Sequence, residues 1–139
     1  MHLPDVIREP DINELAEGSW LLVYSNATAC GVACEQALYK LRQSRLMLGS
    51  EMDRVVRLFL HGESAPDKVF LSEQHAGLVS LQDTGLSQLM NNKKPAGIAA
   101  GGFFLIDPLG NLVMYFPPEL KPRDMVDDLK HLLELSRIG

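Results

Sequence analysis

The order of apolar runs in the first half of the chain predicts a strand, a helix and a second strand. Trp20–Tyr24 is continuously apolar and contains aromatic and β-branched residues, which is typical of a strand buried on both faces of a parallel sheet. The spacing of apolar residues predicts a helix from about Cys34 to Leu48, with Gly49 at its C-cap. Arg54–Leu60 is predicted to be the second strand. Because a helix connects them, the two strands are expected to run parallel in a βαβ unit.

The middle of the chain, from His61 to Pro95, carries weaker signals. Leu78–Leu81 has the composition of a short extended segment, and Thr84 is suited to cap a helix that reaches about Asn91. We therefore expect one short strand and one short helix in this part of the chain.

The last third of the chain again shows a clear pattern. Two apolar runs, Phe103–Ile106 and Asn111–Phe116, are separated by the turn formers of Asp107–Gly110, which predicts an antiparallel hairpin. Pro117–Pro118 ends the second strand, and Pro122 is suited to the first turn of a helix. That helix has one apolar stripe, made of Met125, Val126, Leu129, Leu132 and Leu133. We expect the stripe to pack on the sheet.

The predicted elements follow the order β, α, β, a weak helix, β, β, α, with two cysteines at the start of the first helix. This order is the thioredoxin arrangement, so the predicted fold class is α/β, thioredoxin-like, with a central mixed β-sheet flanked by helices. Residues 1–18, which contain Pro4, Pro10 and several acids, are expected to form an N-terminal arm with a short helix at 12–16. Residues 19–139 are expected to form the thioredoxin-like domain.

Composition limits the classes of function. The 139 residues, 46% of them hydrophobic and 22% charged, fit a single domain with a sizeable core. A net charge of −5 without any run of Lys or Arg lacks the electrostatic footprint of a nucleic-acid-binding protein. No apolar run approaches the roughly 18–20 residues of a membrane-spanning helix, so we expect a soluble chain, with any membrane tether outside it.

The two cysteines lie in Cys30-Gly-Val-Ala-Cys34, where a parallel strand ends and a helix begins. Sheets of the α/β class place ligand-binding and catalytic groups at this edge. Unpaired N–H groups and the dipole of a helix start stabilise a thiolate, so Cys30 is the expected attacking thiol. At positions i and i+4 of a helix, the Cα atoms come within the span of about 4.4–6.8 Å that a disulfide tolerates. The pair is therefore suited to disulfide exchange or metal chelation, and the alternative is an inert pair or bridge.

Beyond this motif, the chain resembles the SCO/SenC family, thioredoxin-like proteins of copper delivery and thiol chemistry in cytochrome oxidase assembly. The resemblance covers most of the chain and rests on Trp20–Tyr24 leading into Cys30 and Cys34, on Leu38 and Leu41, and on Phe104–Gly110 with its following strand. It implies a head domain in the bacterial periplasm or mitochondrial intermembrane space. For this chain we expect the bacterial periplasm, with an anchor in the inner membrane supplied by a segment outside this chain.

The chain departs from the copper site of that family. The family's third ligand is a histidine eight positions before the aspartate matched by Asp107, and that position is Ala99. The proline that commonly follows the family's first cysteine is Gly31, and the cis-proline of ordinary thioredoxins falls at Gly101. His61 is a candidate substitute ligand, because it ends the second strand at the same sheet edge as the cysteines. The alternative is a solvated histidine at a strand end.

Other features favour structural roles. His75, in the weakly patterned middle, and His131, on the polar side of the last helix, are expected at the surface, and no histidine has a zinc-site spacing. The Ala- and Gly-rich segment from Gly97 to Gly102 is expected to pack its backbone closely beside the thiols.

Three functions are consistent with these residues. The favoured one is thiol–disulfide exchange through Cys30 and Cys34, with protein thiols or disulfides as partners, no required cofactor and an accessory role in cytochrome oxidase maturation. The second is a Cu(I) metallochaperone in which Cys30, Cys34 and His61 hold the ion and an oxidase copper subunit receives it. The third is a non-catalytic assembly scaffold with an inert disulfide.

Overall fold

The computed structural model describes residues 18–26, 30–62, 68–82, 92 and 101–136. The short helix expected at 12–16 and the helix expected from Thr84 to Asn91 lie outside these residues. The division into an arm and a domain stays a prediction for the same reason.

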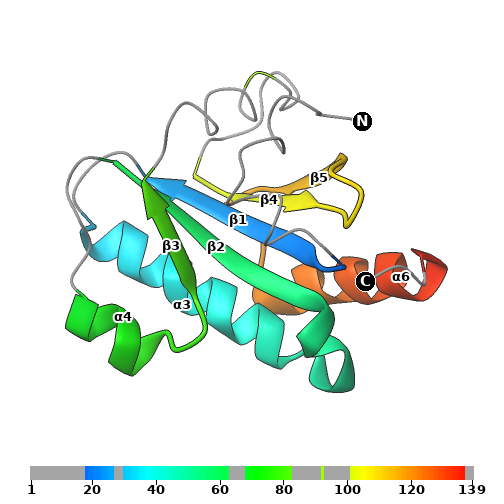
Figure 1. Ribbon diagram of the computed structural model, residues 1–139, viewed down its shortest axis with the longest axis horizontal. Coiled ribbons are helices and arrows are strands. Elements are labelled where there is room, and N and C mark those ends of the chain that lie inside the picture. Colours follow the sequence, from blue (N-terminus) through cyan, green and yellow to red (C-terminus); the bar gives the residue numbers. More distant parts are fainter. Residues whose placement is uncertain (1–17, 27–29, 63–67, 83–91, 93–100, 137–139) are drawn as a thin grey trace.

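A five-stranded mixed sheet forms the centre of the structure, in the order β3-β2-β1-β4-β5 (Figure 1). The strands are β1 (Trp20–Asn26), β2 (Val55–His61), β3 (Val79–Gln82), β4 (Phe103–Ile106) and β5 (Leu112–Phe116). β1, β2 and β3 run parallel, whereas β4 is antiparallel to β1 and β5 is antiparallel to β4. The thioredoxin-like α/β fold predicted from the sequence is therefore confirmed.

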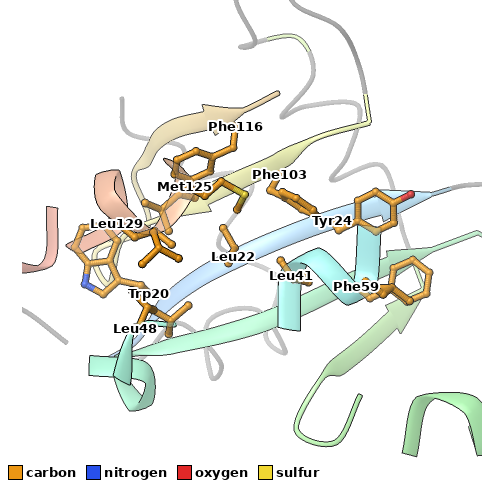
Figure 2. Packing of buried hydrophobic residues seen from close by; sticks show 14 of the residues in the cluster. Trp20, Leu22, Tyr24, Leu41, Leu48, Phe59, Phe103, Phe116, Met125 and Leu129 are labelled. Carbon is orange, nitrogen blue, oxygen red and sulfur yellow. The ribbon is translucent and has the colours of Figure 1, made fainter. Parts of the chain in front are cut away.

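The described helices pack on one face of this sheet (Figure 1). They are α3 (Val32–Leu46), the 3-10 helix η1 (Gly49–Arg54), α4 (Lys68–Gln74) and α6 (Pro122–Ser136). On that face, alternate residues of β1, starting with Trp20 and Leu22, pack against Leu41 of α3 and Met125 and Leu129 of α6 (Figure 2). The apolar stripe predicted for the last helix is confirmed, because its residues face this core. The intervening residues of β1 belong to a second buried cluster on the other face.

The ends of the first helix differ from the prediction. α3 begins at Val32 and ends at Leu46, two residues earlier at each end, and its C-cap is Met47. Gly49 has a positive φ of 62° and begins η1, so its predicted role as the C-cap is wrong. The tighter η1 turn follows Leu48, which is buried in the core, while Met47 stays 42% exposed. The chain thus leaves the α-helix after Leu46, and the turn that follows buries Leu48 in the core.

The middle of the chain contains a helix that the sequence did not predict. α4 has only seven residues and its inner side presents Phe70 and Leu71 to the core, which is too short a pattern for helical periodicity to be recognised. The short strand predicted at Leu78–Leu81 is confirmed as β3, one residue later at each end.

The turn between β4 and β5 confirms the predicted hairpin and shows why its residues suit it. One carboxylate oxygen of Asp107 accepts hydrogen bonds from the backbone N–H groups of Leu109 and Asn111, at 3.0 and 2.8 Å. Gly110 has a φ of 90°, which a residue with a side chain rarely adopts. The Asp and Gly therefore close the turn by hydrogen bonding and by backbone freedom, respectively.

Gly102, just before β4, gives the first testable prediction of the fold. A Cβ atom at this position would lie 1.9 Å from the backbone oxygen of Phe116, so Gly102→Ala requires the β4–β5 hairpin to shift. We expect a loss of about 1–3 kcal/mol in the free energy of unfolding, the usual range for overpacking.

Urea denaturation of the two proteins measures this loss. Gly31→Ala is the matched control, because a Cβ atom there meets nothing within 4 Å and its φ is −96°, so only the weaker N-cap preference of Ala, about 0.5–1 kcal/mol, should be lost. Equal stability of the Gly102→Ala variant and the parent would contradict the close approach.

Candidate functional site

The first turn of α3 is formed by the residues of the cysteine motif. Gly31 is the N-cap in an extended conformation, and its carbonyl oxygen accepts the first helical hydrogen bond from the N–H of Glu35 at 2.9 Å. No side chain caps this end, so the backbone N–H groups of the first turn have no side-chain acceptor at the N-cap. Glu35 in the first turn complements the positive end of the helix dipole.

Cys30 and Cys34 form a disulfide across this turn. Their Cα atoms are 5.1 Å apart, within the span expected from their spacing, and the two sulfur atoms are 2.09 Å apart. The structure thus brings the two predicted catalytic residues together. Their catalytic role stays a prediction.

The two sulfur atoms differ in their surroundings. Cys34 is 1% exposed and belongs to the hydrophobic core, because it lies inside the first turn on the face of α3 that packs against the sheet. Cys30 precedes the helix and is partly exposed. Of the two sulfurs, Cys30 is the one that an incoming reactant reaches more easily.

A pocket of about 350 Å³ opens along α3, and Ala33, the neighbour of Cys34 in the chain, is one of the residues that line it. It lies between the first turns of α3 and the sheet, and it is lined by Tyr24, Ala33, Gln36, Ala37, Lys40, Gly101, Phe103 and Pro118. Lys40 donates a hydrogen bond from its ammonium group to the carbonyl oxygen of Pro118, which joins the two walls. The sequence did not single out Lys40 or Pro118, because they lie far apart in the chain and neither belongs to a motif.

Burial raises the pKa of Tyr24, which forms part of the wall of this pocket. The tyrosine is 6% exposed and stacks against Phe59, with ring centroids 5.8 Å apart (Figure 2). Its hydroxyl therefore stays protonated at physiological pH. The pocket wall at this point is an aromatic surface with a neutral hydroxyl.

Two glycines of the Ala- and Gly-rich segment are described. Gly101, the position where ordinary thioredoxins have a cis-proline, has a φ of 94° and lines the pocket. Gly102 donates its N–H to the hydroxyl of Tyr115 at 2.9 Å. Close backbone packing is thus present at Gly102, where the neighbours belong to β5, and the expected location of the segment beside the thiols stays a prediction. Ala99 lies outside the described residues, so its predicted position near the thiols stays a prediction.

His61 is the last residue of β2, as predicted, and pairs with Asn26 at the end of β1. Its Nδ1 lies 2.8 Å from the carbonyl oxygen of Gly62. Because a carbonyl only accepts, Nδ1 carries the proton, which leaves Nε2 of the neutral ring as the nitrogen for a metal ion. Among the described residues, no three His, Cys, Asp or Glu side chains are grouped as a metal site. His61 is therefore not assembled with the disulfide into one ligand set.

The expectation for His75 was wrong, and that for His131 was correct. His75 is only 4% exposed and packs edge-on against Phe70 of α4, with ring centroids 5.1 Å apart, whereas His131 is exposed on α6. His75 was misplaced because α4, whose end it follows, was not predicted.

Comparison with known proteins identifies the fold family. The model of the family described as transmembrane-like, thioredoxin-like, C-terminal domain matches residues 20–136. No curated protein sequence matches the chain.

Among solved structures, copper-bound yeast Sco1 is similar with a TM-score of 0.67 and 21% identity, covering 88% of this chain and 82% of that one. Copper-bound ScoI of Bradyrhizobium japonicum has a TM-score of 0.64 and 20% identity, covering 86% and 88%. A thiol:disulfide interchange protein of Chlorobium tepidum has a TM-score of 0.65 and 18% identity, covering 87% and 84%. The resemblance to the SCO/SenC family is thus confirmed for the fold.

Although the family description contains the word transmembrane-like, none of the helices in the described part of the chain has the length and apolar character to cross a membrane. The match extends from the first residue of β1 to the last residue of α6 and includes both cysteines. The chain therefore belongs to the family of transmembrane-like, thioredoxin-like C-terminal domains.

Proposed function

We propose that this protein exchanges disulfides with other proteins through Cys30 and Cys34. The observation that carries the proposal is the unequal placement of the two sulfurs, with Cys30 partly exposed before α3 and Cys34 buried one turn later. An exchange reaction needs one accessible sulfur to meet the partner and a second sulfur within reach to complete the reaction.

In the reduced protein, the Cys30 thiolate attacks one sulfur of a partner disulfide. A bond forms between Cys30 and that sulfur, and the second partner sulfur leaves as a thiolate. Cys34 then loses its proton to solvent and attacks Cys30, which closes the observed disulfide and releases the partner as a dithiol. The pair of electrons passes to the partner, and a thiol reductant must restore the protein by the reverse steps.

The location of Cys30 supports its role as the attacking group. It directly precedes the N-cap Gly31, so its sulfur lies near the positive end of the α3 dipole and the unpaired N–H groups of the first turn. Both features stabilise a thiolate there. Cys34, inside the hydrophobic core, is better protected from reactants other than Cys30.

The pocket beside α3 is the proposed binding site for the segment of the partner protein that flanks the partner's reacting cysteine. It begins at Ala33, the neighbour of Cys34, and its walls include the aromatic rings of Tyr24 and Phe103. An apolar side chain of the partner would fill this space and hold the partner disulfide in register with Cys30.

We place this activity in cytochrome oxidase maturation, as an accessory step in the bacterial periplasm. The support is the resemblance of the cysteine motif and of Phe104–Gly110 to the SCO/SenC family, together with the shared fold of the Sco structures. Partners would then be thiols or disulfides of an oxidase copper subunit, and a membrane anchor would come from a segment outside this chain.

Binding of Cu(I) as cargo is the second candidate function, because two cysteine sulfurs at one helix start are the soft ligands that Cu(I) prefers. Two of the three ligands of the family's copper site are present in this chain. The two thiolates of the reduced protein would hold the ion, while Ala99 replaces the family's histidine and Nε2 of His61 is a candidate third ligand. A scaffold with an inert disulfide is the outcome if both activities are absent.

The redox state of the pair gives a direct test of exchange. We expect two titratable thiols after reduction and none after mild oxidation, because the cysteine Cα atoms are 5.1 Å apart and close an intramolecular bridge. Thiol titration combined with size-exclusion chromatography measures both the count and an unchanged oligomer size. Two thiols that persist under oxidant would refute the redox couple.

The two cysteines should also differ in reactivity. Alkylation of the reduced protein at mildly acidic pH, read by mass spectrometry, should modify Cys30 at least about tenfold faster than Cys34, since only Cys30 is both accessible and next to the helix start. Cys34→Ser should accumulate mixed disulfides with a model partner, and Cys30→Ser is the matched control that should not. Preferential labelling of Cys34 would reverse the roles, and equally slow labelling of both would favour the scaffold.

Competition with a Cu(I) chelator tests the second function. We expect weak retention of Cu(I) by the reduced parent, and Ala99→His should raise the affinity if residue 99 faces the thiols as in the family. His61→Ala should weaken binding only if Nε2 of His61 is a ligand. No gain from Ala99→His together with no loss from His61→Ala would leave the thiolates without a third ligand from this chain.

A further inference from the structure

A second group of chemically active side chains lies away from the disulfide. Arg57 is the third residue of β2 and is only 3% exposed, on the face of the sheet that carries the helices. Arg42 lies in the second half of α3, and His75 directly follows α4. These three residues, which we call the cationic cluster, come from three elements that are separate in sequence. The disulfide lies at the N-terminal end of α3 and follows the C-terminal end of β1, whereas Arg42 is in the C-terminal half of α3 and Arg57 is in the N-terminal half of β2.

Two backbone carbonyls on either side of His75 hold the arginines of the cluster in place. Arg57 donates from Nη2 to the carbonyl oxygen of Ala76, and Arg42 donates from Nη1 to that of Gln74, the last residue of α4. Capping of a helix C-terminus by cations explains these two contacts. It leaves Nε and Nη1 of Arg57 and Nε of Arg42 without an acceptor, while the guanidinium group of Arg42 also lies over the ring of Tyr39, 5.0 Å from its centroid.

Four buried nitrogen atoms of the cluster have no hydrogen-bond partner. They are Nε and Nη1 of Arg57, Nε of Arg42 and Nδ1 of His75. In Arg57 these atoms carry three of the five N–H donors of the guanidinium group. Buried donors without acceptors are rare in folded proteins, and those of a charged group are the most unfavourable. The cluster is therefore short of acceptors.

The cluster is also short of negative charge. Arg45 of α3 adds a further cation nearby, and its acidic partner Asp53, at 3.7 Å, has a side chain that is 91% exposed. In the described part of the chain, no carboxylate forms an ion pair with Arg57 or Arg42. Burial first, and then the charges of Arg42 and Arg57, lower the pKa of His75 below its ordinary value, so the ring is neutral at neutral pH. The guanidinium group of Arg57 is buried and that of Arg42 is half-buried, and in the described part of the chain no carboxylate compensates either charge.

We propose that the cationic cluster binds a small oxyanion of the phosphate or sulfate class. Such an ion supplies several oxygen acceptors and the missing negative charge together, and its tetrahedral oxygens match donors that come from different directions. Chloride offers the charge but a poorer match to the planar guanidinium fork. The unpartnered atoms have no contact with solvent, so entry of the ion needs a displacement of the α4 end. α4 has only seven residues, of which Phe70 and Leu71 pack against the core.

Unfolding of the full chain in its oxidised form, with added inorganic phosphate, tests the proposal. A ligand that binds only the folded protein raises the folding equilibrium constant by about elevenfold when its concentration is about ten times its Kd. We expect this gain with phosphate at neutral pH and a much smaller one with chloride at equal ionic strength. Side-chain Nε–H signals of Arg57 in NMR spectra should shift over the same phosphate range.

Arg57→Met separates the anion site from a purely structural cap. Without phosphate, this variant should be at least as stable as the parent, because it removes an uncompensated buried charge, and it should lose the phosphate gain. Arg123→Gln on α6, an exposed site far along the chain, removes the same charge and should keep the gain. A second variant, Arg42→Gln, keeps the test open if Arg57→Met fails to fold, because Arg42 is half-buried and tolerates the change. It should reduce the phosphate gain by at least about threefold.

Three results would overturn the proposal. One is an equal effect of chloride and phosphate, which would mean that ionic strength alone explains the gain in stability. Another is an undiminished phosphate gain in Arg57→Met, or in Arg42→Gln where the first variant does not fold. The third is a stability gain without any shift of the Arg57 Nε–H signal, which would place the ion elsewhere. None of these results bears on disulfide exchange, because the thiols are oxidised throughout.

Discussion

Strand β1 pairs in parallel with β2 along its whole length and antiparallel with β4 at Leu21–Val23, and its first five residues are buried. Both hydrogen bonds and packing therefore hold the first part of this strand in place. The chain that leaves it leads to Cys30 and into α3, which packs back on the same sheet. The rigid position of β1 therefore determines where the cysteine motif lies.

This constraint explains why two identical side chains acquire different chemistry. The four-residue spacing places Cys34 on the inner side of α3, next to the buried surface of the sheet, and leaves Cys30 before the first turn. Burial protects one sulfur, and the unpaired N–H groups of the helix start favour the thiolate form of the other. The asymmetry comes from the junction between strand and helix, so a change of neighbouring side chains would alter it less than a shift of α3.

The strands and the two long helices were predictable because their burial leaves a local record in the sequence. The run from Trp20 to Tyr24 is apolar throughout, as in a strand buried on both faces, and the stripe from Met125 to Leu133 repeats with the period of a helix. The closeness of the two cysteines was predictable from their four-residue spacing at the start of a predicted helix. α4 and the pocket walls at Lys40 and Pro118 were not, since a seven-residue helix shows too few turns and a tertiary pocket leaves no local pattern. Arg57 is unusual already in the sequence, because it is a charged residue within an otherwise apolar strand. The sequence does not predict which of its N–H groups lack a hydrogen-bond acceptor.

The two candidate sites occupy opposite ends of α3, and the polarity of that helix suits each of them. Its N-terminal end concentrates partial positive charge from backbone N–H groups, which favours a thiolate at Cys30. Its C-terminal half carries Arg42 and Arg45, and Arg45, in the last turn, is favoured by the partial negative charge of the terminal carbonyls. The helix dipole offsets part of the repulsion among the arginines, but it supplies no acceptor for the N–H groups of Arg57 on the sheet below. For this reason the fold accommodates the cationic cluster although several of its N–H groups lack acceptors. The proposed oxyanion would supply those acceptors and the negative charge that the helix provides only in part.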